Sequence, residues 1–166
     1  MLVLGVDPGA SATGYGMVAR SDGVLRAVEY GSIITSAIDS FPSRLQQIFS
    51  RLAELIRRHQ PDWAAIETLV FAKNAQSAFK LGQVRGVALL AAAQWGLPIA
   101  EYTPLQVKSA VTGYGAAGKG QVQRMVQSLL GLREPPRSMD AADALAIAIC
   151  HHHSAGLRHL SRGKGR

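Results

Sequence analysis

Four acidic residues stand where the surrounding sequence is apolar or small. Asp7 ends the apolar run LVLGVD, and Glu67 ends a second short run that begins with WAAI. Asp140 and Asp143 open the apolar segment MDAADALAIAIC, and a spacing of three residues places both on one face of a helix. An unpaired carboxylate is costly to bury. We therefore expect these side chains to be held in place by something positively charged.

Carboxylates gathered in this way predict metal chemistry. Within a few ångström of one another they repel unless cations lie between them, and oxygen ligands without His or Cys favour Mg²⁺ or Mn²⁺. Two such ions about 4 Å apart can activate a water molecule and stabilise the leaving oxygen of a phosphodiester, so we expect two Mg²⁺ per active site, with Mn²⁺ able to substitute. The residues predicted both to bind metal and to catalyse hydrolysis are Asp7, Glu67, Asp140 and Asp143.

Each of these acids also has a purely structural interpretation. Acidic residues in the first turn of a helix interact favourably with its dipole, which would explain Asp140 and Asp143. Asp7, directly before a Pro-Gly pair, would serve as a turn residue. Glu67 is the hardest to explain without a ligand. Glu101, in IAEYT, is a weaker fifth candidate.

The elements that must position these acids are predicted by the spacing of apolar residues. Short runs rich in Val, Ile and Tyr predict strands, and apolar residues at helical spacing predict helices. The expected strands are 2–7, 14–20, 24–35, 62–68 and 97–104. The expected helices are 41–60, about 75–95, 105–113, 121–131 and about 139–153. Ser40 and Pro42 are suited to cap and begin the first of these helices.

This order predicts an α/β fold built on a mixed five-stranded sheet with helices on both faces. The first three strands, joined by short turns such as SDG at 21–23, form an antiparallel meander. The last two strands follow helices, so they pair in parallel through right-handed crossovers. Ligands of such sheets collect beyond the carboxyl ends of the strands. Asp7 and Glu67 should therefore lie side by side there, with the last helix placing its two aspartates across them.

Composition and charge narrow the class of protein. The chain has 166 residues, 48% of them hydrophobic, and a formal net charge of +7. We expect one domain over 1–156 and a basic, flexible tail over 157–166. No apolar run approaches the ~18 residues that span a bilayer, the amino terminus is unlike a secretory signal, and Cys150 is the single cysteine. These features predict a cytoplasmic protein with no membrane partner. The positive charge predicts a polyanionic partner, although a generally basic solvated surface would also account for it.

Four stretches of the chain resemble the RuvC family of Holliday-junction resolvases. They are GVDPGASATGYG, AIET with the later FAKNAQSAFKLGQVRGVAL, QVKSAVTGYGAAGKGQVQ and DAADALAIAI, in order over about residues 1–154. The resemblance implies an RNase H-like fold and a homodimer that makes paired, Mg²⁺-dependent incisions in four-way DNA junctions during recombination and repair. It also implies cooperation with the RuvA–RuvB branch-migration complex and a preference for a short consensus at the cut. The catalytic acids of the family fall on the same four positions predicted above.

Two lysines are expected to bind DNA close to the acids. Lys119 begins the helix after the glycine-rich loop GYGAAGKG, where free backbone N–H groups favour a phosphate, and Lys108 lies in the preceding short helix. The resemblance places the family's functional lysines on both positions; otherwise they are solvated surface residues. Lys73, Ser77 and Lys80 form a further helical stripe that would follow a DNA strand or simply face solvent.

One position departs from the family pattern. Family members generally have an aromatic residue three positions after the catalytic glutamate, implicated in opening the junction, and here that position is Val70. Phe71, one residue later, is expected either to stack on an unpaired base, worth about 1–3 kcal/mol, or to belong to the core. The small residues around Gly82 and Gly86 would suit close packing on the sheet or, as the resemblance favours, a helix-mediated dimer.

Three other interpretations fit parts of the sequence. An RNase H-like nuclease acting on an RNA–DNA hybrid would keep the four acids without needing a dimer. The stretch DPGASATGYG is also similar to the phosphate loop of actin-like ATPases, although that fold needs two such domains, more than 166 residues supply. A non-enzymatic junction-binding scaffold gains nothing from clustered carboxylates. His151 to His153 are consecutive, so they do not share a helical face, and we expect them to end the last helix rather than to bind metal.

Overall fold

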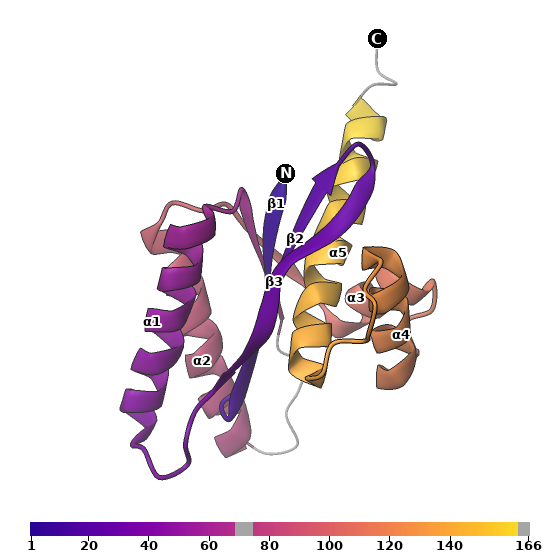
Figure 1. Ribbon diagram of the computed structural model, residues 1–166. Coiled ribbons are helices and arrows are strands. Elements are labelled where there is room, and N and C mark those ends of the chain that lie inside the picture. The colour runs from indigo at the N-terminus through magenta and orange to yellow at the C-terminus, as the bar shows by residue number, and fades with distance from the viewer. Residues whose placement is uncertain (69–74, 163–166) are drawn as a thin grey trace.

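The computed structural model describes residues 1–68 and 75–162, and a five-stranded mixed sheet forms its centre (Figure 1). Its order is β3-β2-β1-β4-β5. The strands are β1 (Leu2–Asp7), β2 (Ala12–Ser21), β3 (Val24–Ile34), β4 (Trp63–Glu67) and β5 (Ile99–Tyr102). The first three pair antiparallel, and β4 pairs in parallel with both β1 and β5. The predicted sheet of three antiparallel strands followed by two parallel strands is confirmed.

Helices cover both faces of the sheet, as expected. They are α1 (Phe41–His59), α2 (Ala75–Gln94), α3 (Pro104–Thr112), α4 (Lys119–Leu130) and α5 (Met139–Arg162). Figure 1 shows α1 and α2 on one side of the sheet and α3, α4 and α5 on the other. Helix α5 packs directly on β1 and β2, and α3 and α4 pack against α5. One face is therefore covered by two helices and the other chiefly by one.

Local sequence signals set the limits of several elements. Asp22 and Gly23 form the loop between β2 and β3, and both have positive φ, 51° and 80°, as a type I′ hairpin turn requires. Ser40 caps α1, because its hydroxyl accepts a hydrogen bond from the Ser43 backbone N–H. The turn and the helix start that the sequence indicated are both present.

Glycines in β1 and β2 allow the backbone of α5 to touch the sheet. A Cβ added at Gly14 would lie 2.0 Å from the backbone oxygen of Asp140, and one added at Gly5 would lie 2.0 Å from that of Ala144. Only glycine tolerates so close an approach of a second backbone. The first turns of α5, which carry two of the predicted acids, are therefore held directly against the strands.

Helix α5 is longer than predicted. The expected helix ended at about His153, whereas the observed helix continues to Arg162, into the segment expected to be a tail. His151 and His152 are buried. The Nε2 atom of His152 lies 2.9 Å from the Val18 carbonyl oxygen, and burial lowers the pKa of this imidazole. The expectation that the histidines end the helix is therefore wrong, and a buried, neutral His152 instead joins α5 to β2.

The protein has two hydrophobic cores, one on each face of the sheet. Because successive strand residues point to opposite faces, Val3 belongs to the core under α5 and Leu4 to the core under α1 and α2. Cys150 is buried in the first of these, as expected of a small core residue, and burial raises the pKa of its thiol to about 11. Within residues 1–68 and 75–162, no helix combines the length and apolar character needed to cross a bilayer.

Candidate active site

Two of the predicted acids meet at one end of the sheet. Asp7 is the last residue of β1, and Glu67 is the last residue of β4. In the parallel pairing of these strands Val6 lies opposite Ile66, so the two acids that follow are neighbours. Both side chains are half-buried. The adjacency expected from the strand order is present.

Helix α5 brings the other two acids to the same place. Asp140 lies in its first turn, and Asp143 follows one turn later. The Ser138 hydroxyl accepts a hydrogen bond from the Ala141 backbone N–H and donates one to Asp140 Oδ2, both at 3.3 Å. The Ser32 hydroxyl of β3 lies 2.5 Å from that of Ser138. The Asp140 carboxylate is thus fixed by the start of its own helix and by the sheet.

The four carboxylates act on one another electrostatically. Burial, together with the charges of the other three acids, raises the pKa of Asp7 to about 8. Burial and the charge of Asp143 raise the pKa of Glu67 to about 7. Burial also raises the pKa of Asp143, with a contribution from Asp140. A fully ionised cluster is therefore costly unless a cation compensates it.

Both predicted lysines lie beside the acids. Lys119 Nζ is 3.7 Å from Asp143 Oδ2. Lys119 is the first residue of α4, and its cap Gly118 makes no side-chain hydrogen bond there, so this helix start can bind an anion. The positive charge of Lys108, on α3, lowers the pKa of Glu67 and so opposes the effect of burial. The structure brings the two lysines and the four acids together.

The donor set fits a divalent cation. Carboxylate oxygens are the ligands that Mg²⁺ and Mn²⁺ prefer, and like-charge repulsion among them is what a cation relieves. In the part of the chain that the structure describes, no three Asp, Glu, His or Cys side chains converge closely enough to hold an ion unaided. Mg²⁺ ordinarily keeps several waters and takes phosphate oxygens as further ligands. A site completed by water and by substrate phosphate is consistent with this geometry.

Lys80 and Glu101, the remaining candidates in the described part of the chain, do not join this cluster. Lys80 is exposed on α2 and packs over an aromatic ring of α1. Phe71 and Lys73 lie outside the described residues. Glu101, the weaker fifth acid, forms an ion pair with Arg85. The roles of Phe71, Lys73 and Lys80 in DNA binding stay predictions.

Two features of the site were missed in the sequence. Ser138 stands two positions before Asp140, where a serine commonly caps a helix, and this signal would have identified it. Gly14 lies within a strand, and an isolated glycine in a strand often marks the close approach of another backbone. That the approaching backbone is the one carrying Asp140 follows only from the tertiary structure.

Comparisons with known proteins agree with this geometry. The family model described as Crossover junction endodeoxyribonuclease RuvC matches residues 3–151, which include all four acids. Relatives with that name in Moorella thermoacetica and Geobacter sp. (strain M21) are 56% and 50% identical over 151 and 163 residues, or 91% and 98% of this chain. The alignments cover 90% and 99% of the relatives themselves.

A solved structure gives the same result at the level of the fold. Thermus thermophilus RuvC in complex with a Holliday junction substrate matches with a TM-score of 0.90 at 37% identity, over 95% of this chain and 96% of that one. The sheet order and the acids at its end thus define a nuclease of the RNase H-like class, as the resemblance implied. Within that class, the chain belongs to the RuvC family.

Proposed function

We propose that this protein is a divalent-metal-dependent endonuclease that resolves four-way DNA junctions during recombination and repair. The observation that carries the proposal is the meeting of acids from β1, β4 and α5 beside Lys119, within the residues that match the RuvC family. A relative with the same fold is known in complex with a Holliday junction. The net charge of +7 suits a polyanionic substrate.

The chain's own residues do most of the positioning. The sheet fixes the backbones of Asp7 and Glu67, and the Ser138 hydroxyl orients Asp140. Lys119 and the free N–H groups at the start of α4 bind the scissile phosphate, which the acids alone would repel. The metal ligands are Asp7, Glu67, Asp140 and Asp143. Two Mg²⁺ bound there would supply an activated water and stabilise the leaving oxygen, and Mn²⁺ would substitute.

Proton release accompanies metal binding in this arrangement. The raised pKa values of Asp7 and Glu67 leave part of the metal-free site protonated near neutral pH. Carboxylates must lose these protons to bind a metal, so metal affinity should increase from about pH 6 to pH 9.

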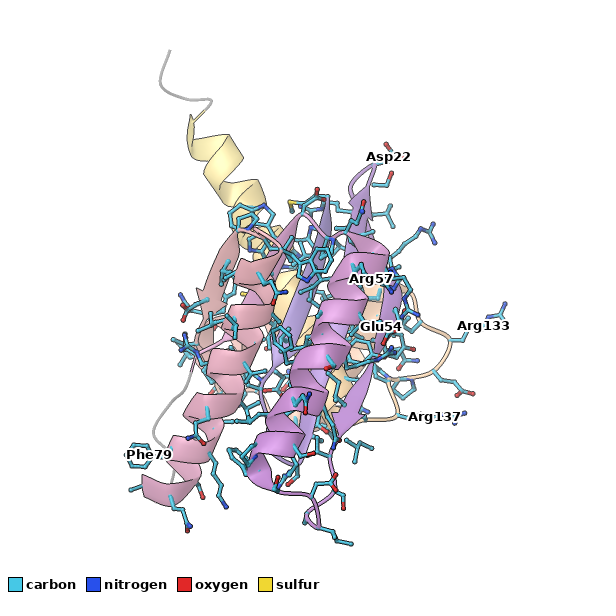
Figure 2. The ribbon with its side chains drawn as sticks, turned by 90° about the vertical axis from the view of Figure 1, so that its left-hand side faces the viewer. Asp22, Glu54, Arg57, Phe79, Arg133 and Arg137 are labelled. Atoms are coloured by element: carbon cyan, nitrogen blue, oxygen red, sulfur yellow. The ribbon has the colours of Figure 1, made fainter. Side chains whose placement is uncertain are left out.

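The proposal includes a homodimer, since two symmetric cuts need two active sites. Helix α2 exposes Phe79 and Leu90, with relative accessible surfaces of 75% and 58% for the whole residues. Figure 2 shows Phe79 projecting away from the body of the protein. A hollow beside Phe79 is lined by Ala75, Ala78 and Gly82, small residues that a second copy could approach closely. We further expect the protein to act in the cytoplasm with the RuvA–RuvB branch-migration complex.

The first experiment compares substrates. A synthetic four-way junction, a linear duplex and an RNA–DNA hybrid of the same sequence are incubated with Mg²⁺, Mn²⁺ or EDTA. The junction should be cut in two symmetric positions with either metal and not in EDTA. Preferential cleavage of the hybrid would instead support the alternative RNase H-like activity.

The second experiment tests the acids. Asp7→Asn, Glu67→Gln, Asp140→Asn and Asp143→Asn should each lower the single-turnover rate by at least about 1,000-fold, or ~4 kcal/mol, because each removes a metal ligand. Junction binding should be kept, since neutralising an acid relieves repulsion of phosphate. The matched control is Asp22→Asn in the β2–β3 turn, which Figure 2 shows at the tip of the hairpin and which should cut normally. Any acid variant that cuts at the wild-type rate removes that residue from the site.

A further inference from the structure

A cavity of about 550 Å³ lies between β3 and the segment that joins α4 to α5. Its lining includes Tyr30 from β3 and Arg133, Arg137 and Ser138 from the joining segment. The volume exceeds that of a single phosphate group and falls within the range of small-ligand sites. None of the residues assigned above to metal or phosphate binding lines this cavity.

The cavity is nevertheless adjacent to the active site. Ser138, which forms part of its wall, donates its hydroxyl hydrogen to Asp140 Oδ2. On the sheet side, Ser32 pairs with Gly14, which in turn pairs with Asp7. Neighbouring strands are about 4.8 Å apart, so Ser32, which follows the lining residue Gly31 and bonds to Ser138, lies roughly 10 Å from Asp7.

Two positive charges in the cavity have no partner of their own. The guanidinium groups of Arg133 and Arg137 make no hydrogen bond or ion pair with any residue in 1–68 or 75–162. Figure 2 shows both side chains extending outward from the same segment. Glu134 also lines the cavity, so the net charge of its side chains is positive. Neither arginine contributes to the pKa shifts of Asp7 or Glu67, whose positive neighbours are Lys108 and Lys119.

We propose that this cavity is a second DNA subsite, in which Arg133 and Arg137 bind a backbone phosphate near the cleaved bond and Tyr30 packs against the adjoining sugar. Arg137 stands three positions before Asp140, a span of at most about 10 Å. Successive nucleotides rise about 3.4 Å along a strand, so the phosphate is one to three nucleotides from the scissile one. Lys108 and Lys119 bind the strand beside Asp143, and the subsite binds it beside Asp140. The proposal deepens the proposed function and rests on it.

The experiment uses the full-length protein, four-way junctions and neutral phosphate analogues. Binding is measured in Ca²⁺ over a range of salt concentrations, and cleavage is measured under single-turnover conditions in Mg²⁺. Each phosphate contact contributes about 0.9 to the slope of log affinity against log salt on duplex DNA. Arg137→Gln should therefore lower the magnitude of this slope by up to about 0.9. The double variant Arg133→Gln/Arg137→Gln should lower it by no more than about 1.8, the value for two phosphate contacts. The matched control is Arg57→Gln, an exposed arginine of α1 on the other side of the sheet.

Phosphate mapping identifies the contact. A methylphosphonate is placed singly at each of the three phosphates on either side of the cut. At one of these positions the analogue should weaken binding by wild type and have no further effect on Arg137→Gln. Additive losses at every position would overturn the subsite, because the arginine would then act only through general charge.

Tyr30 gives an independent readout. Tyr30→Ala should leave the salt slope unchanged and lower the single-turnover rate by about 10-fold, since it removes packing and no charge. Tyr30→Phe, which keeps the ring, should restore the rate. If Arg57→Gln and Arg137→Gln give the same slope of log affinity against log salt, the cavity does not bind DNA. Its positive charge would then suit an acidic peptide instead. If the wild-type protein does not cut junctions at all, the proposed function is wrong. If the wild-type protein cuts junctions and Arg137→Gln has the same salt slope and the same cleavage rate, only the proposed subsite is wrong.

Discussion

The two faces of the sheet are packed in different ways. Under α1 and α2, large side chains such as Met17, Leu52 and Leu55 fill the core. Under α5, glycines allow a helix backbone to touch the strands, and two of the four acids are carried on that helix. The first face is an ordinary core, whereas the second is a core that also carries half of the proposed active site. Substitutions on the first face should therefore lower the unfolding free energy without changing the cleavage rate, whereas substitutions on the second face should lower both.

The largest effect on the α5 face is expected from Gly14→Ala. Its Cβ would meet the backbone oxygen of Asp140 at 2.0 Å, so the helix or the strand must move. We expect the unfolding free energy to fall by about 1–3 kcal/mol. The single-turnover rate on a junction should fall by about 100-fold, the cost of a displacement of roughly 1 Å at an active site.

A glycine with open surroundings is the control for this substitution. A Cβ at Gly120 in α4 would meet nothing closer than Arg124 Nη1, at 3.7 Å. Gly120→Ala should therefore leave the unfolding free energy unchanged or slightly raised. Denaturant titrations measure both variants. A Gly14→Ala protein that cuts at the wild-type rate would show that the close approach is unnecessary.

A matched pair of leucines tests the comparison directly. Leu55 lies on α1 and Leu145 on α5, and both are fully buried. Leu55→Ala and Leu145→Ala should each lower the unfolding free energy by about 2–5 kcal/mol. Only Leu145→Ala should also lower the cleavage rate of the folded fraction, measured well below its melting temperature. Equal rates for the two variants would break the proposed distinction between the faces.

The acids predict a pH dependence that metal should reverse. The pKa of Asp7 is about 8 in the folded protein and about 3.9 when unfolded, so between these values the folded state binds the extra proton. Its contribution to stability is therefore lost as pH rises toward 8. In EDTA, Asp7→Asn should equal wild type near pH 4 and exceed it in stability by up to about 5 kcal/mol at pH 9, or about 10–20 °C in melting temperature.

Millimolar Mg²⁺ should raise the melting temperature of wild type more than that of Asp7→Asn, because the ion binds only the folded state. Differential scanning calorimetry at several pH values measures both effects, with Asp22→Asn as an exposed-acid control. A metal-free wild type that is more stable than Asp7→Asn at pH 9 would contradict the electrostatic clustering of the acids.

The smallest effect is expected at the helix caps. Ser40 caps α1 and Ser138 caps α5, so the same substitution can be made on each face. Ser40→Ala and Ser138→Ala should each lower the unfolding free energy by about 1 kcal/mol. Ser138→Ala should in addition cut about 10-fold more slowly, since it frees the Asp140 carboxylate. Rescue by Ser138→Thr, which keeps the hydroxyl, separates orientation of the carboxylate from simple loss of stability.

Most of the sheet and the pairing of the first two acids were accessible from the sequence. Strand periodicity located the runs that end in Asp7 and Glu67, and the rule that parallel strands share an end placed them together. The start of α1 was likewise predicted from Ser40 and Pro42, because helix capping depends on residues next to one another in the chain. Such features depend on neighbours within a few residues of one another.

The parts that failed depend on distant contacts. His152 lies in the middle of a helix because the Val18 carbonyl, far away in the chain, accepts a hydrogen bond from its buried ring. Local rules favour a histidine near a helix end, and tertiary burial overrode them. The cavity beside Tyr30 likewise combines β3 with a segment about a hundred residues later in the chain, which no periodicity could connect.

The packing of α5 against Gly5 and Gly14 also determines at what stage of synthesis the four acids can first come together. A ribosome completes all five strands by Tyr102, well before it reaches Asp140. Chains fold progressively from the amino terminus during synthesis. A nascent chain can therefore form the complete sheet, with Asp7 and Glu67 in place, before Asp140 and Asp143 have been synthesised. The four acids can therefore come together only once the last helix docks on the sheet.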